Sequence, residues 1–287
     1  MKKIPFLICL LIAVNWNICA QITGSGDNCT ITYVANDGFL IQTSGHKILV
    51  DAIFGKIKGN WCDQPGDSLL NLIYSGKPPY DNIDLLLVTH YHSDHFNSPM
   101  VLRFLNNNPD ALVVCPSQAN EIMKKDSLYK KLAGLIHSLK TDTLLDTTMA
   151  LRNITIKAMR LKHGSWIEKD TLTGKSYDIH RNVENIGYLV TSDNFRFLHT
   201  GDCATDNNYQ FERLKLSSAE TEISFMGIVF LSPEGQSVLS NYIRSKKIVL
   251  MHVTPGKADY YRGILKDYSE FQIFGKPGES VVWDFTK

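Results

Sequence analysis

The sequence predicts an α/β protein with four layers, an αββα sandwich in which two β-sheets pack face to face and helices cover both outer surfaces. Each half of the chain opens with short β-rich runs and continues with alternating strands and helices. No linker rich in Pro, Gly or Ser separates the halves, so we expect one domain. The chain has 287 residues, 44% of them hydrophobic, and is long enough to bury a large core.

The first twenty residues have the features of a secretory signal peptide. Lys2 and Lys3 precede an apolar run over residues 4–14, and the small residue Ala20 closes the segment. The run is too short to span a bilayer comfortably, and nothing later approaches eighteen uninterrupted apolar residues. We therefore expect residues 1–20 to be removed and residues 21–287 to form the mature domain, without a transmembrane segment. The expected location is periplasmic or secreted, with a retained or lipid-anchored form as the alternative.

The first half is expected to open with an antiparallel meander, because β-rich runs alternate with turn residues at 36–38 and 44–45. The expected strands cover residues 29–34, 39–43 and 47–50. From residue 83 the pattern changes to the alternation of strands and helices that is typical of an α/β unit. The expected elements there are a strand at 83–88, a helix at 98–106, a strand at 111–115 and a helix from 117 toward 125.

The second half repeats this order. The expected strands cover residues 154–161, 186–190, 195–198, 223–230 and 247–251. A helix should begin at Ser232 and Pro233, because Ser is a favoured N-cap and Pro is tolerated in the first turn.

Two long segments, residues 55–79 and 164–185, have no place in this plan. Long segments of this kind in a compact domain are usually functional or disordered. They carry four aromatic residues suited to gripping a substrate, namely Trp61, Tyr74, Trp166 and Tyr177.

The charge balance and the cysteines exclude some classes of protein. Thirty basic residues stand against twenty-nine acidic ones, so the chain has no global electrostatic attraction to nucleic acid or anionic lipid. Four cysteines follow the signal segment without CxxC spacing, which excludes a zinc ribbon. In an exported protein they permit three disulfide pairings, and the sequence does not choose among these or buried free thiols. These residues are Cys29, Cys62, Cys115 and Cys203.

The strongest local signal is the segment LLLVTHYHSDHF at residues 85–96. An apolar strand ends at Thr89, and His90 and His92 follow, two residues apart, so their side chains point to the same side of an extended segment. Asp94 and His95 come where the chain turns. Imidazole and carboxylate together suit zinc or another first-row divalent ion, whereas calcium prefers oxygen ligands. The segment therefore predicts a metal site.

This segment resembles the signature of the metallo-β-lactamase superfamily. Three further segments match that family in order, namely ILVD at 48–51, FLHTGD at 197–202 and IVLMH at 248–252. The resemblance implies an αββα fold with two divalent metals between the sheets, most simply Zn²⁺, with Mn²⁺ or iron as alternatives. It implies that His90, His92 and a third histidine hold one metal. By the same resemblance Asp94, His95 and His252 hold the second, and Asp202 bridges the two.

The third histidine is ambiguous in the sequence. His163 follows a predicted strand, the position from which the family's ligand projects, and we prefer it. His180 lies in a polar loop and is the alternative, with substrate contact or proton transfer as its other role. His199 lies inside a strand, where a packed, hydrogen-bonded role is favoured over one behind the ligands. Asp51 is expected to orient a ligating histidine, because a metal-bound imidazole usually donates its other N–H group.

The resemblance implies an exported hydrolase that activates water between its metals for attack on an ester, lactone or phosphodiester. Asp94 and Asp202 are the expected catalytic carboxylates, and Trp61 and Trp166 the expected aromatic contacts to a small-molecule or lipid-like substrate. The run ITYVANDGF at 31–39 is similar to lactonase and phosphodiesterase members. The alternatives are a β-lactamase and a non-catalytic metal-binding or assembly protein on the same fold. No nucleic-acid partner is expected, and the sequence makes no prediction of the oligomeric state.

Overall fold

The structure is a computed structural model that describes residues 28–140, 142 and 144–285. The expected signal segment, residues 1–20, lies outside the described residues. Within the described part of the chain, no helix combines the length and the apolar character needed to cross a bilayer.

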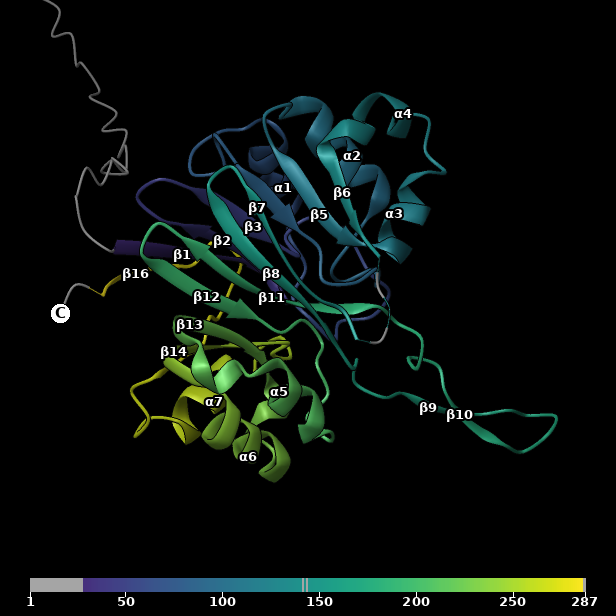
Figure 1. The fold of residues 1–287 in the computed structure, drawn as a ribbon, viewed down its shortest axis with the longest axis vertical. Helices are drawn as coiled ribbons and strands as arrows, with labels where there is room; N and C mark the ends of the chain where they lie inside the picture. Colours follow the sequence, from purple (N-terminus) through teal and green to yellow (C-terminus); the bar gives the residue numbers. More distant parts are fainter. Residues whose placement is uncertain (1–27, 141, 143, 286–287) are drawn as a thin grey trace, which may run out of the picture.

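Two seven-stranded sheets form the centre of the molecule, and helices cover the outer face of each, which confirms the predicted αββα sandwich (Figure 1). The first sheet has the order β16 (Ser280–Asp284), β1 (Asn28–Ala35), β2 (Gly38–Gln42), β3 (Lys47–Val50), β4 (Leu85–Leu87), β5 (Leu112–Pro116) and β6 (Ile136–Leu139). The second has the order β15 (Phe271–Gln272), β14 (Arg244–Met251), β13 (Glu220–Gly227), β12 (Phe195–His199), β11 (Asn185–Ser192), β8 (Ile154–Leu161) and β7 (Asp146–Leu151).

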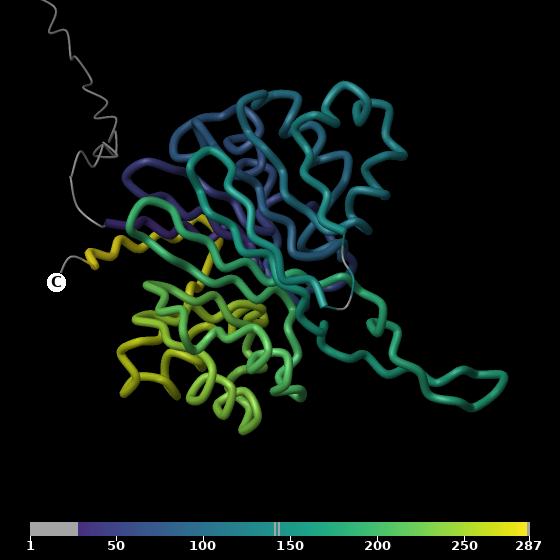
Figure 2. Tube along the Cα trace, viewed as in Figure 1, coloured from purple at the N-terminus to yellow at the C-terminus, as the bar shows by residue number. Residues whose placement is uncertain are grey.

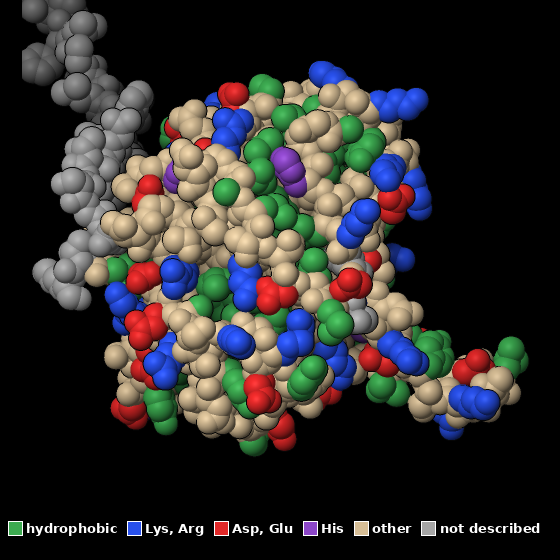
Figure 3. Space-filling view, viewed as in Figure 1, with side chains coloured by type: hydrophobic (Ala, Val, Ile, Leu, Met, Phe, Trp, Pro, Cys, Tyr) green, Lys and Arg blue, Asp and Glu red, His purple; other side chains and the backbone are tan. Residues whose placement is uncertain are grey.

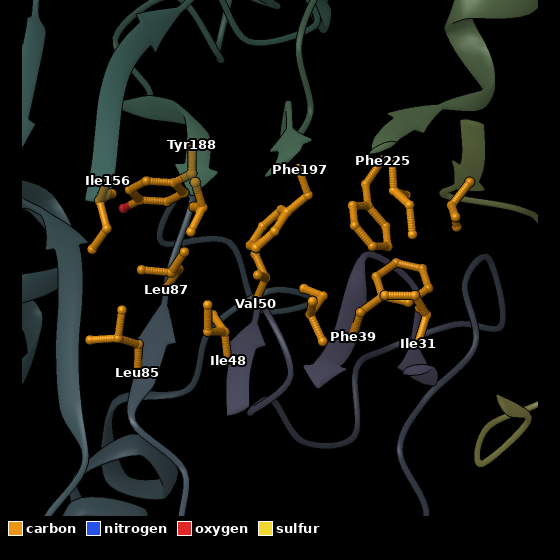
Figure 4. Packing of buried hydrophobic residues seen from close by; sticks show 14 of the residues in the cluster. Ile31, Phe39, Ile48, Val50, Leu85, Leu87, Ile156, Tyr188, Phe197 and Phe225 are labelled. Carbon is orange, nitrogen blue, oxygen red and sulfur yellow. The ribbon is translucent and has the colours of Figure 1, made fainter. Parts of the chain in front are cut away.

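The main core lies between the two sheets, where side chains from facing strands interdigitate (Figure 4). Successive residues of a strand point to opposite faces, so in β4 Leu85 and Leu87 enter this core while Leu86 faces the helices. Phe39 of the first sheet packs on Phe225 of the second, with ring centroids 4.7 Å apart. Each such buried side chain stabilises the fold by about 1.5–3 kcal/mol. This packing therefore fixes the edge of one sheet relative to the edge of the other.

The helices form the two outer layers. The first sheet is covered by α1 (Asp67–Tyr74), α2 (Ser98–Asn107), α3 (Ser117–Met123) and α4 (Tyr129–Leu132), with the 3₁₀ turn η1 (Ala133–Leu135). The second is covered by α5 (Asn208–Leu214), α6 (Pro233–Tyr242) and α7 (Ala258–Ile264), with the 3₁₀ turns η2 (Leu216–Ser218) and η3 (Ile228–Leu231). The predicted cap of α6 is confirmed, since the Ser232 hydroxyl accepts a hydrogen bond from the Gly235 N–H at 3.1 Å.

Two predicted features differ from the structure. The strand expected at 223–230 ends at Gly227, because its partner β14 ends opposite it at Met251 and the ladder has nothing further to pair with. The segment 55–79 contains the helix α1, and Tyr74 lies buried on the inner face of that helix. The guanidinium of Arg103 sits 4.6 Å from the centroid of its ring. Tyr74 is therefore part of the helix packing, and the prediction that it grips a substrate is wrong.

The segment 164–185 contains a two-stranded ribbon made of β9 (Ile167–Lys169) and β10 (Ser176–Asp178). Figures 1 and 2 show it projecting from the body of the molecule. Asp178 fixes its base, since one carboxylate oxygen accepts hydrogen bonds from the backbone N–H groups of Trp166 and His180, both at 3.0 Å. The ribbon therefore leaves the body at a defined point.

The four cysteines are buried free thiols in the described part of the chain. Burial raises the pKa of the Cys62 and Cys115 thiols to about 12, so both stay uncharged at neutral pH. On the molecule's outside, basic and acidic side chains are interspersed over the lower half of the face in Figure 3, in keeping with the near-neutral charge of the chain.

Candidate metal centre

The predicted ligands follow the carboxyl ends of strands that point to one edge of each sheet. In the first sheet β3 and β4 are parallel, and Asp51 and His90 come after them. In the second sheet β12 and β14 both run parallel to β13, and Asp202 and His252 come after them. The two edges meet, since the Ile186 N–H donates to the Thr89 carbonyl across the sheets at 2.9 Å. Ligand sites in α/β folds form at such edges.

Four side chains form what we call the first ligand group, namely His90, His92, His163 and Asp202, whose ligand atoms lie within 4.8 Å of one another. The Nε2 atom of His90 lies 3.1 Å from Nδ1 of His92 and 3.3 Å from Nε2 of His163. The Oδ2 atom of Asp202 lies 3.5 Å from Nε2 of His163. Three nitrogens and one oxygen thus converge on one small volume.

The second ligand group consists of Asp94, His95, His252 and again Asp202, also within 4.8 Å of one another. The Nε2 atom of His95 lies 3.0 Å from Oδ2 of Asp94 and 3.4 Å from Oδ1 of Asp202. The Nε2 atom of His252 lies 3.6 Å from Oδ2 of Asp202. Asp202 therefore belongs to both groups, in the position that a bridging ligand needs.

The turn before Asp202 requires glycine. Gly201 has φ +54°, and a Cβ atom there would lie 2.3 Å from Oδ1 of Asn185. That same oxygen accepts the N–H of Asp202 at 3.2 Å. The Gly-Asp pair lets the backbone pass close to Asn185, which in turn holds the Asp202 backbone in place.

The donor set fits divalent metal ions. The buried Nε2 atom of His95 has no hydrogen-bond partner among the described residues, although it faces two carboxylates. The Nδ1 atom of His163 donates to the Gly164 carbonyl at 2.7 Å, and Nδ1 of His95 lies 2.8 Å from Oδ2 of Asp51. With Nδ1 as the donor, each ring keeps the Nε2 lone pair for a metal. Mixed nitrogen and oxygen donors of this kind suit zinc and other first-row divalent ions.

Asp51 orients histidines of both ligand groups. It accepts from Nδ1 of His95 directly and from the Thr89 hydroxyl, whose oxygen lies 3.0 Å from Nδ1 of His90. Its other oxygen accepts the Thr89 N–H at 2.8 Å. Asp51 and His252 both have positive φ, +44° and +57°. Such backbone strain in non-glycine residues is concentrated at functional sites.

The histidines of the two groups titrate differently. In the first ligand group, burial holds the pKa of His90 well below its usual range and lowers the pKa of His92 to about 4. In the second, burial also disfavours charge, but Asp94 and Asp202 outweigh it and hold the pKa of His95 well above its usual range. In the same way Asp202 overcomes burial and raises the pKa of His252 to about 9. Metal binding at the second ligand group must therefore displace protons, and weakens as pH falls.

His180 lies beside the first ligand group but outside it. Its ring centroid is 4.4 Å from that of His163 and 4.7 Å from that of His92. Its Nδ1 atom lies 3.0 Å from the Gly164 carbonyl oxygen, the acceptor that His163 also uses. The structure thus places His163 within the first ligand group and His180 beside it.

His199 is buried in β12 and connects two turns of the site. Its Nε2 atom donates to the Asp37 carbonyl at 3.0 Å, and its Nδ1 atom accepts the Gly201 N–H at 3.2 Å. Because a carbonyl can only accept and a backbone N–H can only donate, the imidazole is neutral with one fixed tautomer. It ties the turn that carries Asp37 to the turn that carries Asp202.

Two tryptophans flank the centre. The ring of Trp61 stacks on His252, with centroids 5.6 Å apart and an interplanar angle of 18°. The ring of Trp166, at the base of the ribbon, lies 6.3 Å from that of His180. Both are exposed, with 43% and 59% of their surface accessible. Tyr177 lies farther out on the ribbon, with its hydroxyl toward Glu168.

The β1–β2 turn also contributes to this site, which was not predicted from the sequence. Asn36 donates to Oδ2 of the ligand Asp94 at 2.9 Å, and Asp37 is fully buried beside the second ligand group. A signal was present, since in a meander β1 runs in the same direction as β3. Polar residues after β1 must then reach the same edge as Asp51, which follows β3.

Comparison with known proteins gives consistent results. A family model described as the beta-lactamase superfamily domain matches residues 46–258. A UPF0173 metal-dependent hydrolase from Polaromonas sp. is 24% identical over 294 residues, covering 98% of this chain and 99% of that protein. A second, from Bacillus velezensis, is 25% identical over 234 residues, covering 77% and 84%. Among solved structures, a metallo hydrolase from Ignicoccus hospitalis has a TM-score of 0.58 at 13% identity, covering 90% of this chain and 100% of that one. At this identity the structural likeness supports the fold alone.

Proposed function

The chain belongs to the beta-lactamase superfamily, and on that premise we propose that it is an exported, metal-dependent hydrolase with a dinuclear zinc-type centre. The observation that carries the proposal is that Asp202 is common to two ligand groups, each of which holds at least two histidine nitrogens. A carboxylate in this position offsets the repulsion between two cations held a few ångströms apart. Export rests on residues 1–20 of the sequence alone.

The chemistry that such a metal pair supplies when bound is a water made nucleophilic near neutral pH and a positive field at the oxygen that gains charge. The protein's own residues prepare the site for this. Asp51 and Thr89 fix the rings of His90 and His95, and Asn36 fixes one oxygen of Asp94. Asp94, held in this way, is the carboxylate that we propose orients the attacking water. Because these groups are already in place, little reorganisation is needed during the reaction.

The surroundings support a substrate with an apolar or ring-shaped part. Trp61 lies over His252 on one side of the centre, and Trp166 and His180 lie on the other. Exposed indole rings lose little conformational entropy on binding and bury a large area. We propose an ester, lactone or phosphodiester of a small or lipid-like molecule as the substrate, with these side chains contacting the groups that flank the bond to be cleaved.

The test is a panel of chromogenic esters, lactones and phosphodiesters, assayed with metal-free and zinc-reconstituted protein. We expect at least one class to be hydrolysed, with activity lost on chelation and restored by Zn²⁺, because water alone is a poor nucleophile at neutral pH. Activity that survives complete removal of metal would contradict a metal-dependent reaction. If Zn²⁺ binds and no class is turned over, the non-catalytic metal-binding alternative gains support.

A further inference from the structure

The side chain of Asp37 has an environment that no structural role explains. It is 0% exposed, and neither of its carboxylate oxygens has a hydrogen-bond partner among the described residues. A buried carboxylate without partners is costly, and proteins retain one only where a cation or a proton offsets it. The groups that act on it electrostatically include Asp202, His95 and His252, three members of the second ligand group.

The backbone around Asp37 is held tightly in place. The carbonyl of Asp37 accepts the Nε2–H group of His199 at 3.0 Å. A Cβ atom on Gly38 would lie 2.8 Å from the Asp51 carbonyl oxygen, so the turn presses directly against the end of β3. On the other side Asn36 donates to Asp94. The turn is therefore fixed against two residues of the metal centre and the histidine behind Asp202, and Asp37 cannot swing out to water without breaking these contacts.

The balance of charges in the site suggests a role for the Asp37 carboxylate. The second ligand group contributes the carboxylates Asp94 and Asp202, and Asp51 lies behind His95. With neutral imidazoles these three carry one negative charge fewer than two divalent cations need for balance. Asp37 adds a fourth carboxylate to these three, and it makes the balance complete. At short range and with little access to water, an uncompensated charge is unfavourable.

We propose that Asp37 is the charge-compensating carboxylate for the metal at the second ligand group, acting through its field rather than as a ligand. This rests on the proposed dinuclear centre. Its ligand atoms are not among those that converge in either ligand group. In the metal-loaded protein its negative charge offsets the second cation, whereas in the metal-free protein burial raises the pKa of Asp37 by more than His95 and His252 lower it, so its charge is only partly offset. Asp37 therefore strengthens metal binding and lowers the stability of the metal-free protein.

The experiment compares Asp37→Asn with the unchanged protein and with Asp193→Asn as a matched control. Asp193 accepts hydrogen bonds from Thr43 and Gly45 at the opposite edge of the sheets, away from the metal centre. Metal-free protein is titrated with Zn²⁺ against a competing chelator. We expect Asp37→Asn to bind the first Zn²⁺ as the unchanged protein does and the second at least about tenfold more weakly, the scale of effects from residues behind the ligands. Asp193→Asn should bind both ions normally.

A second measurement separates this role from a structural one. Thermal unfolding of metal-free Asp37→Asn should have a midpoint equal to or above that of the unchanged metal-free protein, because the replaced carboxylate has no hydrogen bond to lose. A midpoint lowered by several degrees, or equal weakening of both Zn²⁺ ions, would show that Asp37 simply supports the turn. Normal affinity for the second ion would also overturn the proposal.

Asp37→Ser serves as a second variant and should behave as Asp37→Asn does. Failure of both variants to fold would count against the proposal, since a side chain without partners is not needed for folding. If the unchanged protein binds fewer than two Zn²⁺ ions, the dinuclear centre itself is wrong. If the unchanged protein and both variants all bind two Zn²⁺ ions with normal affinity, the dinuclear centre stands and only the proposed role of Asp37 is refuted.

Discussion

Asp202→Asn is expected to lower the bound metal from two ions per chain to one or fewer and to reduce turnover by on the order of 10³-fold or more. The reason is that Asp202 is common to both ligand groups, so both cations lose their shared anion. The neutral amide can still accept the hydrogen bonds of the site, but it no longer offsets the repulsion between the ions. Metal content after dialysis and kcat on the best substrate of the panel measure the effect.

The matched control is Asp206→Asn, four residues farther along the same loop. Asp206 is exposed and its ion pair with Lys162 lies at the surface, where such pairs contribute little. This variant should keep two metals and full turnover. If Asp202→Asn retained both ions, or if the two variants behaved alike, the bridging position of Asp202 would be refuted.

His163→Ala is expected to lose a metal ion and nearly all activity, whereas His180→Ala should keep both ions. Nε2 of His163 lies 3.3 Å from Nε2 of His90 and 3.5 Å from Asp202, while His180 stands outside both ligand groups. His163 also follows β8 and pairs with Cys203 next to Asp202, so the sheet fixes its position. Metal content and kcat/KM of the two variants, compared side by side, decide the assignment.

For His180→Ala we expect a raised KM with little change in metal content, because its ring can contact a bound substrate but not complete a coordination sphere. Metal lost from His180→Ala and kept by His163→Ala would reverse the assignment. The two residues are a suitable pair for this comparison, since both rings approach the same Gly164 carbonyl and each variant removes one of these contacts.

Much of the fold could be predicted because local patterns decided it. The strand β3 occupies the predicted residues 47–50, and α2 begins at the predicted Ser98 with Asn97 as its cap, accepting the Met100 N–H at 3.2 Å. Both signals are short in range, one a run of apolar residues and the other a side chain that caps a helix. The sequence therefore sufficed where neighbouring residues decide the structure.

Other features depended on contacts between residues that are far apart in the chain. Tyr74 was predicted to grip a substrate, but the helix α1 turns it toward Arg103, a residue of α2. The ribbon of β9 and β10 could not be foreseen, because its exposed short strands lack the alternation of a half-buried sheet. The end of β13 at Gly227 is set by its partner strand. Each of these is decided by a neighbour in space and not in sequence.

In the metal centre, some features could be predicted from neighbouring residues and others depended on distant contacts. The cluster at residues 90–95 was visible because its ligands are adjacent in the chain. The sequence also favoured His163 over His180, because His163 follows a predicted strand, and the structure places His163 in the first ligand group through its bridge to Cys203. The sequence predicted Asp37 only as a turn residue, because Asn-Asp-Gly turns are common. The burial of Asp37 depends on the packing of His199 and Asp51 around the turn.

The most direct test of the dinuclear centre is the metal content of the purified protein, determined by inductively coupled plasma mass spectrometry after growth in zinc-replete medium and exhaustive dialysis. Two ligand groups that share one carboxylate predict about two divalent ions per chain. Dialysis at lower pH should remove the ion of the second ligand group first, because His95 and His252 regain protons there. A metal content near zero at neutral pH in folded protein would contradict a dinuclear centre.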